Sequence, residues 1–150
     1  MGFNIVLVEP EIPNNTGNIG RLSLASGSIL HLIHPLGFEI TDARLKRAGL
    51  DYWRHLDVRL YDDIESFMAL NKDAHFAFLS SKGKKSYHEI DYRDDMFLVF
   101  GKESVGLSEK LLSIYPDRLF RIPMFSEYVR SLNLANAVGI VVYDGLRALH

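Results

Sequence analysis

A chain of 150 residues with 47% hydrophobic residues is long enough to bury a sizeable core, and we expect a single domain over residues 1–150. The sequence has no cysteine, which excludes disulfides and thiolate metal sites and is typical of a cytoplasmic protein, and it has no apolar run long enough to predict a membrane span. Seventeen basic and nineteen acidic residues give a net charge of −2, so any nucleic-acid-binding surface must be a local one.

Short apolar runs alternate with helical segments along the chain. The runs are rich in Ile, Val, Leu and Phe, and they predict buried strands at residues 3–8, 29–33, 75–79, 96–100 and 119–122. Helices are predicted between and after them, at about 16–25 with Asn14 or Asn15 as the cap, after a cap at 41–42, from 62–63 to about 70, at 108–113 and at 134–149.

This alternation predicts an α/β fold with a mostly parallel sheet flanked by helices. In such sheets, ligands bind beyond the carboxyl ends of the strands. Three polar segments begin at these ends: Asn14–Arg21 after the first strand, Leu98–Leu107 at the fourth, and Ile122–Arg147 after the fifth. Their shared position groups them into one candidate site.

Several common site motifs are absent from the sequence. Gly101-Lys102 lacks the upstream glycine and the following Ser or Thr of a phosphate-binding loop, and Gly17 with Gly20 is only part of a dinucleotide-binding fingerprint. His31 and His34 have no further ligands nearby in the sequence, so no metal site is predicted.

Each polar residue of the three segments has a structural explanation as well as a functional one. Arg21 offers a planar fork suited to phosphate, or it forms a surface salt bridge. Gly101 permits close approach of a ligand and Glu103 places a carboxylate at the mouth of the sheet, or both belong to a plain turn. Ser131 or Asn133 caps the last helix, and the same capping loop can present backbone groups to a ligand.

The last helix is apolar on nearly all sides and contains several small residues. We therefore expect it to be buried on more than one side. Either a central position in the monomer or a dimer interface would explain this pattern.

Together, the segments NNTGNIGR, LVFGKESVGL and IPMFSEYVRSLNLANAVGIVVYDGLR resemble the three signature motifs of the SPOUT superfamily of RNA methyltransferases. The TrmL (YibK) type is the most similar, and the resemblance extends from Val8 to Arg147 and includes the segment Gly49–Trp53. It implies an α/β fold with a deep C-terminal trefoil knot and a homodimer with its active site near the subunit interface. The implied reaction is S-adenosylmethionine-dependent methylation of the ribose 2′-hydroxyl of a wobble cytidine or uridine in leucine tRNAs.

The resemblance also assigns roles to individual residues. Arg21 would deprotonate the ribose hydroxyl, although an arginine with a pKa above about 12 is a poor general base and an electrostatic or phosphate-assisted role is chemically easier. The other polar positions of the catalytic site would be Asn15, Glu103, Ser131 and Asn133. Backbone groups that bind the methyl donor would come from Leu79, Gly101, Ile122 and Ser131.

Methyl transfer from a sulfonium is an in-line displacement that requires alignment of the reacting atoms and removal of a proton, without a metal or a covalent intermediate. The predicted set of Arg, Asn, Glu and Ser fits this requirement. Two alternatives remain: an rRNA ribose methyltransferase, and a non-catalytic RNA-binding dimer with the same fold. Basic residues that could contact RNA fall into three groups, Arg44, Lys46 and Arg47, then Lys82, Lys84 and Lys85, and finally Arg121 with Arg130.

Overall fold

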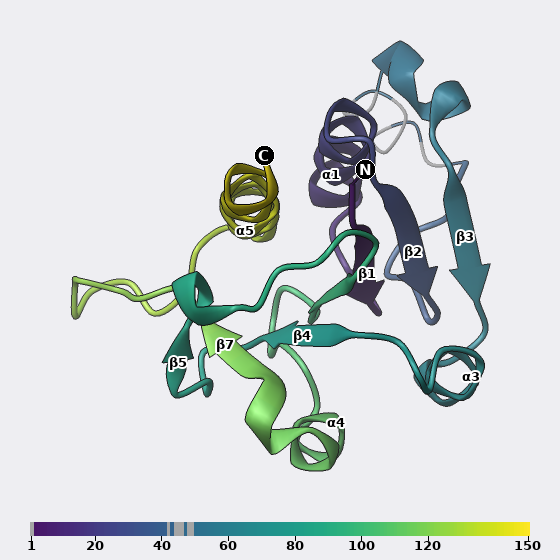
Figure 1. Ribbon diagram of the computed structural model, residues 1–150. Coiled ribbons are helices and arrows are strands. Elements are labelled where there is room, and N and C mark those ends of the chain that lie inside the picture. The colour runs from purple at the N-terminus through teal and green to yellow at the C-terminus, as the bar shows by residue number, and fades with distance from the viewer. Residues whose placement is uncertain (1, 42, 44–46, 48–49) are drawn as a thin grey trace.

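The computed structural model describes residues 2–41, 43, 47 and 50–150 (Figure 1). Seven strands form one sheet in the order β3-β2-β1-β6-β4-β7-β5, and all of its strand pairs are parallel, which confirms the predicted α/β fold. The elements in chain order are β1 (Asn4–Val8), α1 (Pro13–Ala25), β2 (Ile29–Ile33), η1 (Leu50–His55), β3 (Val58–Tyr61), α3 (Ile64–Leu70), β4 (Phe76–Leu79), β5 (Lys85–Ser86), η2 (Tyr87–Glu89), β6 (Phe97–Phe100), α4 (Glu109–Ile114), η3 (Pro116–Arg118), β7 (Leu119–Arg121) and α5 (Leu134–Leu149).

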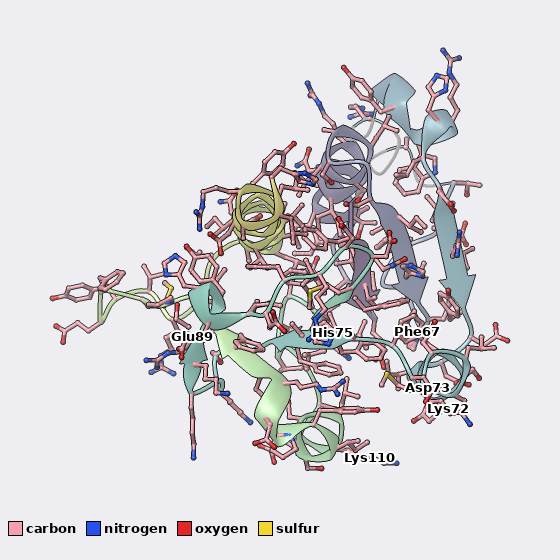
Figure 2. All side chains as sticks on the ribbon, viewed as in Figure 1. Phe67, Lys72, Asp73, His75, Glu89 and Lys110 are labelled. Carbon is pink, nitrogen blue, oxygen red and sulfur yellow. The ribbon has the colours of Figure 1, made fainter. Side chains whose placement is uncertain are left out.

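Helices cover both faces of the sheet, with α1 and α5 on one face and α3 and α4 on the other (Figure 1). Side chains alternate between the two faces along each strand. Thus Ile5 packs in the core with α1 and α5, whereas its neighbour Val6 packs in the core with α3 and α4. Figure 2 shows the side chain of Phe67, which is fully buried, between α3 and the sheet.

Parallel pairing places the carboxyl ends of four strands side by side. In register, Leu7 of β1 is opposite Phe100 of β6, Phe100 is opposite Leu79 of β4, and Leu79 is opposite Phe120 of β7. The three segments that the sequence grouped into one site therefore leave the sheet at its carboxyl end.

Helix α1 begins earlier than the sequence predicted. It starts at Pro13, after Ile12 at the N-cap position, and no side chain caps it. Proline is favoured at the first helical position, because its φ is already helical and its missing N–H has no helical partner to lose. Asn14 and Asn15 therefore lie inside the helix, and the prediction that one of them caps it is wrong.

The predicted caps of α3 and α5 are confirmed, α4 is also capped, and the cap predicted at residues 41–42 includes a position outside the described residues. Asp63 accepts a hydrogen bond from the Ser66 N–H, Ser108 accepts one from the Leu111 N–H, and Asn133 caps α5. Of the two residues considered for that last cap, the structure selects Asn133. A side-chain cap of this kind typically stabilises a helix by about 1 kcal/mol.

Helix α5 is not buried all round within the chain. Val138, Val141 and Val142 are fully buried, but Ile140 is 38% exposed and Tyr143 is 47% exposed on the other side. A central position in the monomer therefore does not explain its apolar sequence.

Two strands of the sheet were not predicted. β3 lies at one edge, where it has polar residues and an exposed Leu60, and β5 contains only two residues.

The predicted helix that carries Arg44 and Lys46, and Gly49 of the segment that resembles the TrmL type, lie outside the described residues. Among the residues that are described, no helix is long and apolar enough to cross a membrane. The C-terminal trefoil knot stays a prediction.

A buried histidine lies on the α3 side of β2. His31 is 1% exposed; its Nδ1 lies 2.9 Å from the Tyr61 hydroxyl and its Nε2 lies 2.8 Å from Asn4 Oδ1. Asn4 donates its amide to the Asp95 carbonyl, which leaves Asn4 Oδ1 as an acceptor for a proton on Nε2. The pKa of His31 is lowered to about 4, chiefly because the buried imidazolium would lose its hydration and secondly because of the charge of Arg59.

We expect this histidine to make folding sensitive to acid. The neutral ring is favoured in the folded state, so its contribution to the free energy of unfolding is complete above pH 6.5 and falls as the pH decreases. Near pH 4 the free energy of unfolding is lower by about 3 kcal/mol. Urea unfolding at pH 7 and pH 4.5 should show that the free energy of unfolding decreases less between these pH values in His31→Gln than in the wild type. His150→Gln, at an exposed position, serves as the control. An equal loss in the wild type and His31→Gln would contradict the prediction.

Candidate active site

A pocket of about 840 Å³ lies at the carboxyl ends of the strands. Its walls come from the ends of β4, β6 and β7, from the start of α1, and from the segment that leads into α5. The predicted site residues that line it are Asn15, Leu79, Gly101, Glu103, Ile122, Ser131 and Asn133.

Three polar side chains connect the three segments. Asn133 donates a hydrogen bond from Nδ2 to Asn15 Oδ1 at 3.0 Å, and Asn15 donates from its own Nδ2 to Glu103 Oε2 at 3.2 Å. The Asn133 Oδ1 accepts from the backbone of α5 as its cap. Each amide is therefore held at both its oxygen and its nitrogen, and the orientation of Asn15, which is only 6% exposed, is fixed.

Glu103 also holds the loop that follows β1. Its two carboxylate oxygens accept hydrogen bonds from the N–H groups of Glu11 at 2.8 Å and Ile12 at 3.0 Å. In the reverse direction, the Glu11 carboxylate accepts from the Ser104 N–H at 2.8 Å and the Ser104 hydroxyl at 3.0 Å, and these bonds hold the pKa of Glu11 below its usual range. This reciprocal pairing was not predicted, because it joins residues more than 90 positions apart.

A second contact between the same loops involves Lys102. Its Nζ lies 3.0 Å from Glu9 Oε1, and this bond raises the pKa of Lys102 above its usual value. Glu9 has a φ of 55°, in the left-handed region. The loops after β1 and β6 are thus joined by several side chains and provide a firm edge for the pocket.

Gly101 lines the pocket, but its own chain already requires a glycine there. A Cβ at this position would lie 2.2 Å from the backbone of Gly106 and Leu107. That backbone returns through a tight turn, closed by a hydrogen bond from the Gly106 N–H to the Lys102 carbonyl at 2.9 Å. The predicted approach of a ligand to Gly101 stays a prediction.

Arg21 is the one predicted site residue that does not line the pocket. Its side chain is exposed, and the guanidinium lies over the ring of Tyr52, 5.1 Å from the ring centroid. Arg21 follows Asn15 by six positions in the helix, which places their side chains about 120° apart around the axis. The structure therefore brings Asn15, Glu103 and Asn133 together, but it leaves Arg21 on another side of α1.

The pocket is positively charged although the chain is not. Four basic side chains line it, those of Lys82, Lys102, Arg121 and Arg130, and Glu103 is its acidic residue. Lys82 is paired with Glu109 and Lys102 with Glu9. Within the part of the chain that the structure describes, Arg121 and Arg130 form no ion pair. Such a lining suits an anionic ligand. No group of three His, Asp or Glu side chains among the described residues could hold a metal ion.

The SpoU rRNA Methylase family model matches residues 2–143. The chain belongs to this family. The similarity to RNA methyltransferases that the three segments predicted is therefore confirmed, and it covers nearly all of the sheet and most of α5.

Individual relatives cover almost the whole chain. The tRNA (cytidine(34)-2′-O)-methyltransferase of Saccharophagus degradans is 46% identical over 148 residues, which are 98% of this chain and 96% of that protein. A solved structure described as "Structural insights into the 2-OH methylation of C/U34 on tRNA" has a TM-score of 0.93 and 44% identity, and the match covers 98% of this chain and 95% of that one. An rRNA methyltransferase from Sinorhizobium meliloti, solved with AdoMet bound, has a TM-score of 0.88 and 25% identity over 99% of this chain and 57% of that chain.

Proposed function

We propose that the chain is a cytoplasmic tRNA methyltransferase that transfers a methyl group from S-adenosylmethionine to the ribose 2′-hydroxyl of nucleotide 34. The observation that carries the proposal is the convergence of Asn15, Glu103 and Asn133 at one positively charged pocket. The similarity to proteins named for this reaction, at 44% to 46% identity over nearly the full chain, supports it.

The pocket fits the methyl donor in size, and its basic side chains suit the phosphates of an RNA substrate. Its volume lies within the usual range for small-molecule sites, and its lining includes the apolar residues Leu79, Phe100 and Ile122. Backbone at Leu79, Gly101, Ile122 and Ser131 would hold the donor. The bound donor supplies an electrophilic methyl group on its sulfonium, and the protein has to position the sugar oxygen in line with it.

In this proposal, Asn15, Glu103 and Asn133 are positioning residues at the pocket, and Arg21 assists the sugar hydroxyl electrostatically or through a phosphate. Arg21 lies outside the pocket of its own chain, so we propose a homodimer in which the second copy supplies it. The exposed Ile140 of α5, in the groove between α1 and α5, supports a contact between copies.

The proposed substrates are leucine tRNAs with cytidine or uridine at position 34. An rRNA methyltransferase is the second candidate, favoured by the family description and by the rRNA enzyme solved with AdoMet. This chain spans only 57% of that enzyme but 95% and 96% of the two proteins described by tRNA methylation, which favours tRNA. The names of the relatives, which are methyltransferases, disfavour a non-catalytic RNA-binding dimer.

A transfer assay distinguishes these candidates. Purified protein is incubated with S-adenosylmethionine labelled in the methyl group and with total tRNA or rRNA, and the labelled nucleotide is then mapped. Label in the ribose of nucleotide 34 of leucine tRNAs is the expected result. Label in rRNA alone would favour the second candidate, and no label together with no heat of donor binding in calorimetry would contradict an enzyme.

Binding of tRNA should weaken as salt increases. If Lys82, Arg121 and Arg130 each contact one phosphate, counterion release predicts a loss of affinity of about 20- to 40-fold between 50 and 200 mM salt. Fluorescence anisotropy with labelled tRNA measures the loss. An affinity that stays constant over this range would count against tRNA as the ligand.

A further inference from the structure

The segment between β7 and α5, residues 123–133, projects as an arm from the body of the protein and is yellow-green in Figure 1. Phe125 is 96% exposed and Tyr128 is 89% exposed, which makes them the most exposed large hydrophobic residues of the described chain. The tip is a tight turn in which the Tyr128 N–H donates to the Ser126 hydroxyl at 3.1 Å. Two aromatic rings are therefore held in solvent by a short ordered loop.

Both ends of the arm belong to the candidate active site. Met124, Phe125 and Arg130 line the pocket, and the arm begins after the paired strand β7 and ends at Asn133, the cap of α5. The rings therefore lie beside the entrance through which a nucleotide would reach the pocket. Their position is fixed by the same elements that position Asn133.

The chemistry of the arm fits unpaired nucleobases. An exposed aromatic ring can stack on any base, and such stacking contributes to binding of single-stranded nucleic acid without sequence preference. Arg121 and Arg130 line the pocket at the base of the arm and can contact phosphates. Glu127 lies between the two aromatic residues in the sequence and is acidic, so the tip of the arm does not suit phosphates. The tip therefore suits the faces of nucleobases, whereas the part of the arm next to the pocket suits the RNA backbone.

We propose that Phe125 and Tyr128 form a stacking platform for unpaired bases of the substrate RNA next to the nucleotide that is methylated. Arg121 and Arg130 contact the adjoining phosphates. This proposal rests on the proposed function and adds to it how the flanking nucleotides are held. The positive charge at the base of the arm favours RNA over a second copy of this chain, whose net charge is only −2.

The test compares two classes of arm variant in the full-length protein. Phe125→Ala, Tyr128→Ala and Phe125→Leu should each weaken tRNA binding at least about fivefold, since a leucine keeps an apolar side chain but has no ring to stack. Phe125→Trp should retain the affinity, and its tryptophan fluorescence should be quenched by tRNA beyond the quenching of wild-type Trp53. Leu70→Ala, at a 74% exposed apolar residue of α3, is the matched control and should bind normally.

Salt dependence separates stacking from phosphate contacts. Phe125→Ala should leave the slope of log Kd against log salt unchanged, whereas Arg130→Gln should reduce its magnitude by about one. Oligomeric state by sedimentation should match the wild type in all arm variants. Donor affinity by calorimetry should match the wild type in Tyr128→Ala, because Tyr128 does not line the pocket.

Three results would overturn the platform. The first is wild-type tRNA affinity and KM in Phe125→Ala and Tyr128→Ala. The second is a change of oligomeric state in these variants, which would make the arm an interface between copies. The third is a loss of donor affinity in Tyr128→Ala, which would make the arm a cover for the donor. Each of these is distinct from failure of the proposed function, which would show as no methyl transfer by the wild-type protein.

Discussion

Replacement of Arg21 by alanine is expected to reduce methyl transfer to tRNA at least about 100-fold, while the affinity for S-adenosylmethionine stays within about twofold. Loss of a group that removes a proton or stabilises developing charge typically costs this much in rate. Donor binding should be unaffected, because Arg21 does not line the pocket. Single-turnover transfer and calorimetry with the donor measure the two quantities.

Two controls accompany the Arg21 variant. Arg59→Ala removes another exposed arginine, one paired only with Asp57, and should keep full activity. Arg21→Lys keeps the charge but loses the planar fork, so partial activity would favour an electrostatic role over a phosphate clamp. Wild-type turnover of Arg21→Ala would contradict every role proposed for this residue.

Mixing two inactive variants tests whether Arg21 acts across the dimer. When Arg21→Ala is mixed with a variant whose own pocket is inactive, half of the dimers contain one copy of each. One of their two sites then combines an intact pocket with an intact Arg21, so about a quarter of the wild-type activity should return. Activity that stays at the level of the separate variants would contradict the supply of Arg21 by a second copy.

Glu103→Gln is expected to lower both stability and activity. The carboxylate accepts hydrogen bonds from the Glu11 N–H, the Ile12 N–H and the Asn15 amide, whereas glutamine would present its own N–H groups to some of these donors. The loss of charge-assisted bonds should decrease the free energy of unfolding by about 2–3 kcal/mol. The displacement of Asn15 should decrease the rate of transfer about 100-fold.

Urea unfolding and single-turnover transfer measure these two effects of Glu103→Gln. Glu65→Gln, at an exposed position of α3, is the matched control and should change neither quantity. A Glu103→Gln protein with wild-type stability and lowered transfer would show that Glu103 acts in the reaction rather than by holding the loop. Wild-type stability together with a wild-type rate of transfer would contradict a role of Glu103 in the reaction and in holding the loop.

The sheet and the location of the site were predictable because they depend on local pattern and on a general rule of topology. Continuous apolar runs mark the buried strands such as β1 and β6, and parallel strands place their carboxyl ends together. β3 was missed because an edge strand needs no apolar run, as the 50% exposure of Leu60 shows. The start of α1 was missed because the asparagines were interpreted as caps, although Pro13 was the stronger signal.

Contacts within the site were predictable only where the spacing along one element decides them. Helical geometry alone separates Asn15 from Arg21 around α1, and this spacing could have shown that one helix does not present both to one pocket. The bonds of Glu103 to backbone N–H groups of Glu11 and Ile12 depend on the exact approach of two loops, which no pattern in the sequence encodes.

The hydrogen bond between Asn133 and Asn15 joins positions 118 residues apart, and it has a consequence for protein synthesis. A nascent chain that has left the ribosome only as far as β7 already contains every strand, but it lacks Asn133 and the whole of α5. If Asn133 acts at the pocket as we propose, catalytic competence arises at the end of translation rather than gradually. A prematurely terminated product would carry most of the fold without any ability to modify RNA.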